Sequence, residues 1–392
     1  MEINQLLNPE IQNFIQENLS TNSSKLTLKK NPFPTSNYTD IIHQIISKNK
    51  AKEKLPTWFF TDKIIYPEKI SIEQTSSEKT AKYKASIVSG KNILDCTGGF
   101  GIDAYYFSKY FDTVIHCEIN PELSKIVEHN YKQLQIKSIK CICGDSSDIL
   151  DQLNKKFDCI YIDPSRRSGS KGKVFMLADC LPNVVELQNF YYQFTDTLLI
   201  KTAPILDLHA GLLELKNVAE IHIVGLDNEI KEVLWKIKKG HQESPKIYAV
   251  NLEKEVIITT EICSNKNYKA TYSLPQKFLF EPNTSLLKSG GFEAVSEIFG
   301  IDKLHQHSHL YSSENLIDFP GRKFKIDSIV PFQKKEIIQS IQGKKMNVST
   351  RNFPIKPDEI KKKYKITDGG SIFAFFTTNL NNEKIVLLCT KI

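Results

Sequence analysis

The hydrophobic residues of the first part of the chain recur at the spacing of an α-helix. One set consists of Ile11, Phe14, Ile15 and Leu19, and a second set consists of Ile41, Ile42, Ile45 and Ile46. Such spacing places the apolar side chains on one helical face. The polar stretch at 20–36 separates the two sets, ends in Asn-Pro-Phe-Pro and predicts a loop. We therefore expect an N-terminal helical region over residues 1–70.

From Lys91 onward, short apolar segments alternate with amphipathic ones. The apolar segments predict strands at 92–96, 113–118, 139–143, 157–162 and 197–201, and the amphipathic segments predict helices at 102–110, 121–134 and about 178–190. Alternation of this kind is typical of a doubly wound, mostly parallel sheet with helices on both faces. Two more strands, at 218–224 and 232–237, are joined by a segment too short for a crossover helix, so we expect antiparallel neighbours. The prediction is a Rossmann-like α/β fold with a seven-stranded sheet over residues 71–250.

The remainder of the chain has a different composition and a different charge. A strand-rich linker and a small unit are expected over residues 251–321, followed by a small α+β segment over residues 322–392. The net charge of the chain is +7, and residues 322–392 hold 15 Lys and Arg against 6 Asp and Glu. The positive charge therefore belongs to the C-terminal segment. Such an asymmetry indicates a polyanionic partner, with a solvated basic surface as the alternative.

Other features of the composition restrict the class of protein. Hydrophobic residues make up 40% and charged residues 25%, which is ordinary for a soluble globular protein. We find neither a membrane-length apolar run nor a secretory signal, so we expect a cytoplasmic protein. The eight cysteines have no metal-site or disulfide spacing, and the triplet His305-x-His307-x-His309 fits a polar hairpin better than a metal site. No metal is expected.

Acidic residues stand at the ends of four successive predicted strands. Asp95 ends the first strand, Glu118 ends the second, Asp145 follows the third and Asp163 ends the fourth. Ligands of open parallel sheets bind beyond the carboxyl ends of the strands. This ordered set predicts that the four side chains share one binding crevice.

A glycine-rich turn follows the first of these strands. Glycine lacks a Cβ and tolerates positive φ, so a ligand can come close to the backbone, and the next helix offers free N–H groups. The spacing differs from the Gly-x-Gly-x-x-Gly of nicotinamide enzymes, although many α/β proteins have some glycine turn. The candidate cofactor-binding residues of this turn are Asp95, Thr97, Gly98, Gly99 and Gly101.

The next two strand ends supply further candidate cofactor ligands. Glu118 can accept hydrogen bonds from both hydroxyls of a ribose, with an exposed strand end as the alternative interpretation. Asp145 can accept from an adenine amino group, and it also begins a good helix-capping sequence. The two roles of Asp145 are compatible.

The stretch Asp163-Pro164-Ser165 is the candidate catalytic segment. Proline makes a rigid turn off the strand, and Asp163 can hold an amino group of the substrate or of the cofactor. Arg166 and Arg167 can clamp a phosphate. The following basic loop, with Lys171 and Lys173, suits a nucleic-acid backbone, and a solvated surface loop is the alternative.

These motifs resemble those of a known family. Residues 91–240 are similar to class I (Rossmann-like) methyltransferases, whose successive motifs match Asp95 to Gly101, Glu118, Gly144-Asp145 and Asp163-Pro164. The whole chain resembles a bacterial group of class I methyltransferases with ferredoxin-like and THUMP-like C-terminal domains. Residues 281–290 are similar to the first of these domains, and residues 351–357 and 368–370 to the second. The resemblance implies S-adenosylmethionine as the cofactor and, because THUMP modules are associated with RNA modification, an RNA substrate.

The resemblance also implies a role for residues outside the strand ends. The element that precedes the first strand often closes over the methionine end of the cofactor, and here it offers the side chains of Gln74, Ser76, Ser77 and Thr80. A helix cap is the alternative role for these four residues. Arg351, within the THUMP-like stretch, is a candidate RNA-binding residue.

One departure from the family pattern leaves the target atom open. Methyltransferases that act on exocyclic amines usually have Asn/Asp-Pro-Pro-aromatic at the fourth strand, whereas Ser165 and Arg166 follow the proline here. Methylation of a pyrimidine C5 atom needs a nucleophilic cysteine. Cys180 lies in an apolar helical pattern, so we disfavour that chemistry.

The sequence therefore predicts a methyltransferase that uses S-adenosylmethionine and acts on a base nitrogen of RNA, either tRNA or rRNA. Asp163 would orient or deprotonate the nucleophile, and the basic C-terminal segment would hold the RNA backbone. One alternative is a methyltransferase for a protein or small molecule. Another is a catalytically silent RNA-binding protein that retains the fold.

Overall fold

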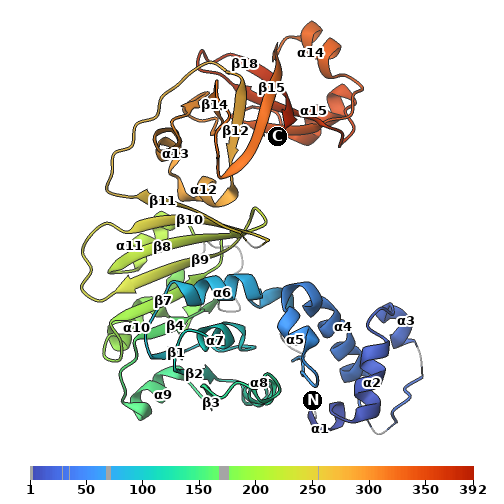
Figure 1. The fold of residues 1–392 in the computed structure, drawn as a ribbon, viewed down its shortest axis with the longest axis vertical. Helices are drawn as coiled ribbons and strands as arrows, with labels where there is room; N and C mark the ends of the chain where they lie inside the picture. The colour runs from blue at the N-terminus through green and yellow to red at the C-terminus, as the bar shows by residue number, and fades with distance from the viewer. Residues whose placement is uncertain (1–2, 29, 35, 68–71, 167–175, 255) are drawn as a thin grey trace. The chain divides into compact units, whose positions relative to one another are not determined.

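The computed structural model describes residues 3–28, 30–34, 36–67, 72–166, 176–254 and 256–392. The chain forms two compact units (Figure 1). Unit 1 comprises residues 1–219 and 232–243, and unit 2 comprises residues 220–231 and 244–392.

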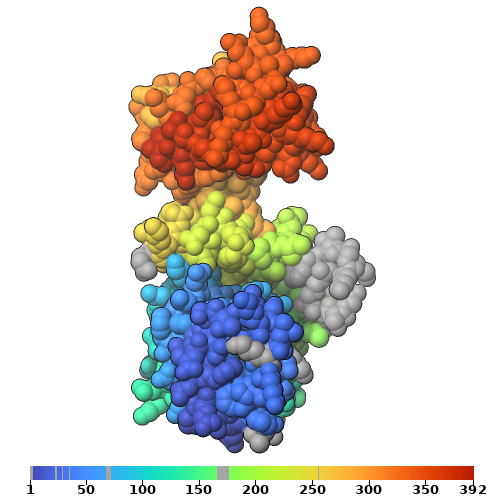
Figure 2. Space-filling model, turned by 90° about the vertical axis from the view of Figure 1, so that its right-hand side faces the viewer, coloured from blue at the N-terminus to red at the C-terminus, as the bar shows by residue number. Residues whose placement is uncertain are grey.

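Unit 1 begins with a group of helices, which are dark blue in Figure 2 and form one face of this unit. They are α1 (Ile3–Leu6), α2 (Pro9–Glu17), α3 (Ser23–Thr27), α4 (Tyr38–Lys54) and α5 (Pro56–Phe60). The prediction of a continuous loop over 20–36 is wrong, because it contains α3. Asn22 caps this short helix, since its side chain accepts a hydrogen bond from the backbone N–H of Ser24 at 2.9 Å.

Two amide side chains fix the end of this helical region. Gln44 on α4 exchanges two hydrogen bonds with the backbone of Tyr66, at 2.7 and 2.8 Å. Asn130 exchanges two with the backbone of Ile65, each 2.9 Å long. The segment that leads to Pro67 is therefore tied to two different helices.

The parallel part of the sheet confirms the predicted fold class. Strands β1 (Asn92–Asp95), β2 (Thr113–Glu118), β3 (Ile139–Cys143), β4 (Cys159–Ile162) and β7 (Thr197–Thr202) run parallel in the order β3-β2-β1-β4-β7. β1 lies at the centre, where the buried Leu94 is paired with Ile115 on one side and Ile160 on the other. The helical elements of this part are η1 (Ile72–Gln74), α6 (Glu78–Ser86), α7 (Ile102–Phe107), α8 (Pro121–Gln133), α9 (Ser146–Leu153), α10 (Val184–Tyr191) and α11 (Leu208–Glu214).

The sheet has nine strands, whereas the sequence predicted seven. The additional strands are β10 (Lys246–Glu253) and β11 (Val256–Cys263), and the full order is β11-β10-β8-β9-β7-β4-β1-β2-β3. β8 (Val218–Leu226) and β9 (Glu229–Lys238) are neighbours, joined by Asp227 and Asn228. Both residues have positive φ, 50° and 65°, as in the two-residue turns of antiparallel hairpins.

The helix predicted at about 178–190 begins later than expected. Residues before it form the turn η2 (Leu177–Asp179) and the strand β6 (Cys180–Leu181), which pairs with β5 (Ser165–Arg166). Proline at 182 disfavours a helix before it, and Asn183 caps α10 by accepting from the N–H groups of the next turn. Cys180 is buried in a short strand, and the helical assignment for it is wrong.

Unit 2 contains a second sheet of seven strands in the order β13-β14-β12-β15-β18-β17-β16. Its strands are β12 (Phe278–Pro282), β13 (Asp302–Lys303), β14 (Tyr311–Ser313), β15 (Gly321–Pro331), β16 (Asn347–Arg351), β17 (Ile372–Thr378) and β18 (Lys384–Lys391). Its helices are α12 (Thr284–Ser289), α13 (Phe292–Phe299), α14 (Lys334–Ile341) and α15 (Pro357–Tyr364). β15 pairs with β12 on one side and β18 on the other, so residues 278–320 and 321–391 share one sheet.

The histidine triplet of unit 2 does not lie on one strand face. Residues 304–310 connect β13 to β14, and these two strands pair antiparallel, so the predicted polar hairpin is present. His305 is buried and makes hydrogen bonds with Asn352 and Asn382 at 3.0 and 3.1 Å. Among the residues that the structure describes, no group of three or more His, Cys, Asp or Glu side chains is arranged to hold a metal ion.

Within the described ranges of the chain, no helix combines the length and apolar character needed to cross a membrane.

Candidate cofactor and active site

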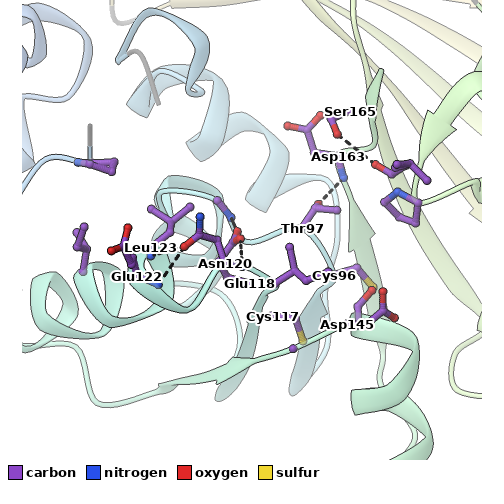
Figure 3. Close-up of a pocket in the computed structure, with 18 of the residues that line it drawn as sticks. Cys96, Thr97, Cys117, Glu118, Asn120, Glu122, Leu123, Asp145, Asp163 and Ser165 are labelled. Atoms are coloured by element: carbon purple, nitrogen blue, oxygen red, sulfur yellow. Dashed lines mark hydrogen bonds between the residues drawn. The ribbon is translucent and has the colours of Figure 1, made fainter. Parts of the chain in front are cut away.

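A cavity of about 800 Å³ lies in unit 1 at the carboxyl ends of β1 to β4 (Figure 3). Apolar side chains line part of it, among them Ile3, Pro67, Ile119 and Leu123. Its polar lining includes Thr97, Gly99, Glu118, Asn120, Glu122, Lys125, Gly144, Asp145, Ser146, Asp163 and Ser165. The structure thus brings together the glycine turn and three of the four predicted strand-end carboxylates.

Glycine is required at the positions of the turn for different structural reasons. A Cβ at Gly98 would stand 2.2 Å from the His116 ring. Gly101 has a φ of 82°, and a Cβ there would stand 2.3 Å from the hydroxyl of Tyr131. These two glycines are required by the side chains packed beneath the turn.

Gly99 is the glycine that faces the cavity. Its φ is 53°, and an added Cβ would meet nothing nearer than the carbonyl oxygen of Thr97, at 3.8 Å. A ligand can therefore approach the backbone at this position, whereas a side chain would take up part of the cavity. Of the three glycines, Gly99 best fits the predicted contact with a cofactor.

Glu118 is held in place by the backbone of two neighbouring loops. Its carboxylate accepts hydrogen bonds from the N–H of Gly99 at 2.9 Å and from the N–H of Asn120 at 2.8 Å. Burial raises the pKa of Glu118, and these backbone hydrogen bonds oppose the rise. A carboxylate has about four acceptor sites, so the side chain can still accept from a ligand.

Asp145 stands at the start of α9 and also lines the cavity. Its side chain accepts a hydrogen bond from the N–H of Ser147 at 2.8 Å, which is the helix cap expected from the sequence.

Asp95, in contrast to the other three strand-end carboxylates, does not line the cavity and is 1% exposed beneath the turn. One oxygen of Asp95 accepts from the N–H of Thr97 at 3.0 Å, and the other has no hydrogen-bond partner among the described residues. Burial, reinforced by Asp103, raises the pKa of Asp95 well above its usual value.

Asp163 links the glycine turn to a lysine that the sequence analysis missed. Its backbone N–H donates to the hydroxyl of Thr97 at 2.7 Å, and its carboxylate forms an ion pair with Lys201. Burial alone would lower the pKa of Lys201. The carboxylates of Asp163, Glu232 and Asp103 outweigh this effect, so the pKa is raised. The sequence signal was present, since Lys201 is the charged residue at the carboxyl end of an apolar strand, β7.

A buried network of charges lies next to this pair. Lys84 is fully buried and contacts Glu232 at 2.8 Å and Asp103 at 3.1 Å. Asp103 also accepts from the hydroxyls of Ser76 and Tyr161, at 3.0 and 2.8 Å. Burial raises the pKa of Glu232, and Lys84 and Lys201 act against that rise.

The four candidates that precede the first strand have separate positions. Ser77 and Thr80 form the capping box of α6, which is the alternative role considered for them. Ser76 joins the network through Asp103 and Lys84, and Gln74 is exposed at the end of η1. None of these four residues lines the cavity.

The rest of the candidate catalytic segment forms a short ribbon. Pro164 is buried, and Ser165 is exposed on β5, where its hydroxyl donates to the carbonyl oxygen of Leu181 at 3.4 Å. The backbone of Arg166 pairs with that of Cys180. Ser165, Leu181 and Pro182 all line the cavity beside Asp163.

The predicted RNA-binding residues are only partly described. Arg167, Lys171 and Lys173 lie outside the described residues. Arg351 belongs to unit 2, where it contacts the buried carboxylate of Glu281 at 2.6 Å, and Arg322 contacts the same carboxylate. Arg351 therefore has a structural partner, and its side chain is 36% exposed.

Three family models match successive parts of the chain. An RNA cap guanine-N2 methyltransferase model matches residues 90–170, a ferredoxin-like domain model matches residues 278–320, and a THUMP domain-like model matches residues 321–391. The domain types implied by the sequence resemblance are thereby confirmed. A search of the curated proteins found no match.

Solved structures also resemble this chain. A proposed methyltransferase from Porphyromonas gingivalis W83 is 29% identical, with a TM-score of 0.86, and the match covers 100% of this chain and 99% of that one. An rRNA methylase from Streptococcus thermophilus is 12% identical, with a TM-score of 0.30, and the match covers 41% of this chain and 93% of that one. A third structure, a proposed methyltransferase from Streptococcus mutans in complex with SAH, is 13% identical with a TM-score of 0.30, covering 41% of this chain and 97% of that one.

Proposed function

We propose that this chain, in which a methyltransferase domain precedes ferredoxin-like and THUMP-like domains, transfers a methyl group from S-adenosylmethionine to a base nitrogen of RNA. The observation that carries the proposal is the cavity at four strand ends, with Gly99, Glu118 and Asp145 on its donor side and Asp163 beside them. The match of residues 90–170 to an RNA methyltransferase family supports the same reaction.

The cavity fits S-adenosylmethionine in size and in chemistry. A volume of about 800 Å³ is in the usual range for pockets that hold small ligands and cofactors. The backbone is accessible at Gly99, Glu118 can accept from ribose hydroxyls, and Asp145 can accept from the adenine amino group. When bound, S-adenosylmethionine supplies an electrophilic methyl group attached to a sulfonium sulfur.

Asp163 is the residue of this chain best placed to handle the acceptor. A carboxylate accepts N–H bonds and so would orient an exocyclic amine and direct its lone pair into the cavity. Such positioning is worth up to about 7–11 kcal/mol of an activation barrier in well-oriented reactions. Cys180 is buried on β6, which gives no support to a cysteine nucleophile and C5 methylation.

The comparisons favour RNA over the other substrates considered. The two relevant family descriptions are an RNA methyltransferase and a THUMP-like domain, and the second coincides with the basic segment 322–392. Exposed lysines of this segment that have no described ion pair with a carboxylate include Lys344, Lys345, Lys362 and Lys363. A protein or small-molecule substrate, or a silent RNA-binding protein, is not favoured.

The test is methyl transfer to RNA from a strain that lacks the gene. Tritiated S-adenosylmethionine and the purified full chain are expected to label this RNA and not RNA from the parent strain, where the site is already methylated. Nucleoside mass spectrometry of the product should show one N-methylated base. Label that survives ribonuclease and is removed by protease would contradict the RNA substrate, and no transfer to any macromolecule would contradict the reaction.

A further inference from the structure

The ion pair between Asp163 and Lys201 stands at the border of the cavity. Asp163 lines the cavity and has a side chain that is 35% exposed, whereas the side chain of Lys201 is 17% exposed. The lysine contacts one carboxylate oxygen, Oδ2. The other oxygen, Oδ1, accepts no hydrogen bond from the described residues, so it is the oxygen left for an acceptor group.

The neighbourhood of this pair is acidic. Asp95 interacts electrostatically with Asp163. Asp103 and Glu232 interact electrostatically with Lys201. The phenol of Tyr161 donates to Asp103 and does not offset this charge. Repeated negative charge in a small volume favours protonation of one carboxyl unless cations compensate.

Two lysines provide that compensation, and they serve different carboxylates. Lys84 is fully buried and is already engaged by Glu232, Asp103 and the hydroxyl of Ser76. Lys201 makes its described hydrogen bond with Asp163. The charge that faces Asp163 at the cavity is therefore that of Lys201.

The pair is not explained by stability alone. Partly exposed ion pairs contribute little to the free energy of unfolding, and a largely buried lysine carries a desolvation cost. The pair nevertheless lies at the cavity where the proposed function puts the acceptor, between the neighbouring strands β4 and β7. A role in the reaction accounts for its position.

We propose that Lys201 is a positioning residue for methyl transfer, which acts by binding Oδ2 of Asp163 and fixing the orientation of the carboxylate, so that Oδ1 accepts the N–H of the acceptor. This inference rests on the proposed function. The acceptor nitrogen forms a bond to the methyl carbon as the carbon–sulfur bond breaks, and sulfur keeps that electron pair. The nitrogen then loses one proton to Oδ1 of Asp163, and water removes it.

The test is a double-mutant cycle in the full chain, with Lys201→Met and Asp163→Asn alone and together. Lys201→Met is expected to lower kcat about 10- to 100-fold, less than the roughly 100- to 10,000-fold effect of removing a proton-transfer group itself, with the Kd for S-adenosylmethionine changed by less than about threefold. In the Asp163→Asn background, Lys201→Met should lower kcat by less than about twofold, because the carboxylate that Lys201 positions is no longer present.

Two further variants separate this role from a structural one. Lys201→Arg keeps the cation and is expected to retain kcat within about tenfold of the wild type while Lys201→Met does not. Lys246→Met removes another lysine that is paired with a carboxylate, Glu261, and should leave kcat unchanged. Calorimetric binding of S-adenosylmethionine shows whether each variant is folded.

Each result has a distinct meaning. A loss in Lys201→Met that is equally large in the Asp163→Asn background, or no loss at all, overturns the role of Lys201 while leaving the proposed function intact. If Lys201→Met does not bind S-adenosylmethionine, the comparison of Lys201→Arg with the wild type decides, and a loss of more than about 100-fold overturns the role. Absence of methyl transfer by the wild type contradicts the proposed function and this inference with it.

Discussion

The hydroxyl of Thr97 accepts a hydrogen bond from the backbone N–H of Asp163 at 2.7 Å, and this contact joins the glycine turn to the end of β4. The residue that borders the donor side of the cavity therefore fixes the residue that would hold the acceptor. Thr97→Val keeps the shape and removes the acceptor oxygen. We expect it to lower kcat/KM about tenfold and to reduce the free energy of unfolding by about 1 kcal/mol.

Thr97→Ser is the matched control for this prediction, because it retains the hydroxyl. Steady-state kinetics and urea unfolding of both variants provide the comparison. No loss in Thr97→Val, or a loss in Thr97→Ser as large as that in Thr97→Val, would contradict a specific role of the hydroxyl.

Alanine at two glycines of the turn is expected to lower the stability of the protein to different extents. Gly98→Ala introduces a Cβ 2.2 Å from the buried His116 ring, so we expect a loss of about 1–3 kcal/mol in the free energy of unfolding. Gly99→Ala meets no close atom and bears only the strain of its positive φ, about 1–2 kcal/mol or less. Thermal denaturation of the two variants should therefore rank Gly98→Ala as the less stable, and the reverse order would contradict the packing described here.

Asp95 predicts a pH dependence of stability in the ligand-free protein. Burial raises its pKa in the folded state, so between the unfolded and folded pKa values the folded state binds more protons. Its contribution to stability is then fully present below the unfolded pKa and is lost as the pH rises toward the folded pKa. In Asp95→Asn this loss is absent, and the free energy of unfolding should fall less between about pH 4 and pH 7 than in the wild type.

The exposed Asp112→Asn serves as the control, since its side chain lies at the surface. Urea unfolding at a series of pH values measures the difference. An unchanged pH profile in Asp95→Asn would mean that Asp95 is ionised in the folded protein.

The basic segment predicts a salt-dependent RNA affinity. Deleting residues 322–392 would not isolate the effect of charge, because it removes β15, which pairs with β12 in the sheet of unit 2. Substituting Lys344, Lys345, Lys362 and Lys363 by alanine is expected to weaken RNA binding and to reduce the slope of log K against log salt by up to about 3–4. Filter binding at several salt concentrations gives that slope.

Four exposed lysines of unit 1, namely Lys79, Lys82, Lys137 and Lys140, provide a control with the same change in net charge. Alanine at these four positions should change the slope less. An equal effect of both sets would indicate general electrostatic attraction and not a binding surface on unit 2.

The strand-end residues could be predicted because their signal is local. An apolar strand that ends in an acidic or glycine residue places that residue at one edge of a parallel sheet, wherever the neighbouring strands come from. Glu118, Asp145 and Asp163 therefore could be grouped before the structure was known. Asp95 followed the same pattern but is buried beneath the turn, which its sequence position does not reveal.

The charge network could not be predicted in the same way. Lys84 and Glu232 come from segments far apart in the sequence, and nothing in either segment indicates that both charges are buried together. Lys201 carried a usable signal at the end of β7, although lysine at a strand end is also common at surfaces. The late start of α10 was marked by Pro182, which the apolar periodicity of the preceding residues concealed.

Binding of the methyl donor in the cavity is tested most directly by calorimetric titration of the full chain with S-adenosylmethionine, for the wild type and for Gly99→Arg. The wild type is expected to bind one equivalent, and Gly99→Arg, whose side chain would occupy the open space at this position, is expected to show no measurable binding. Absence of binding by the wild type, or unchanged binding by Gly99→Arg, would contradict the assignment of this cavity to the methyl donor.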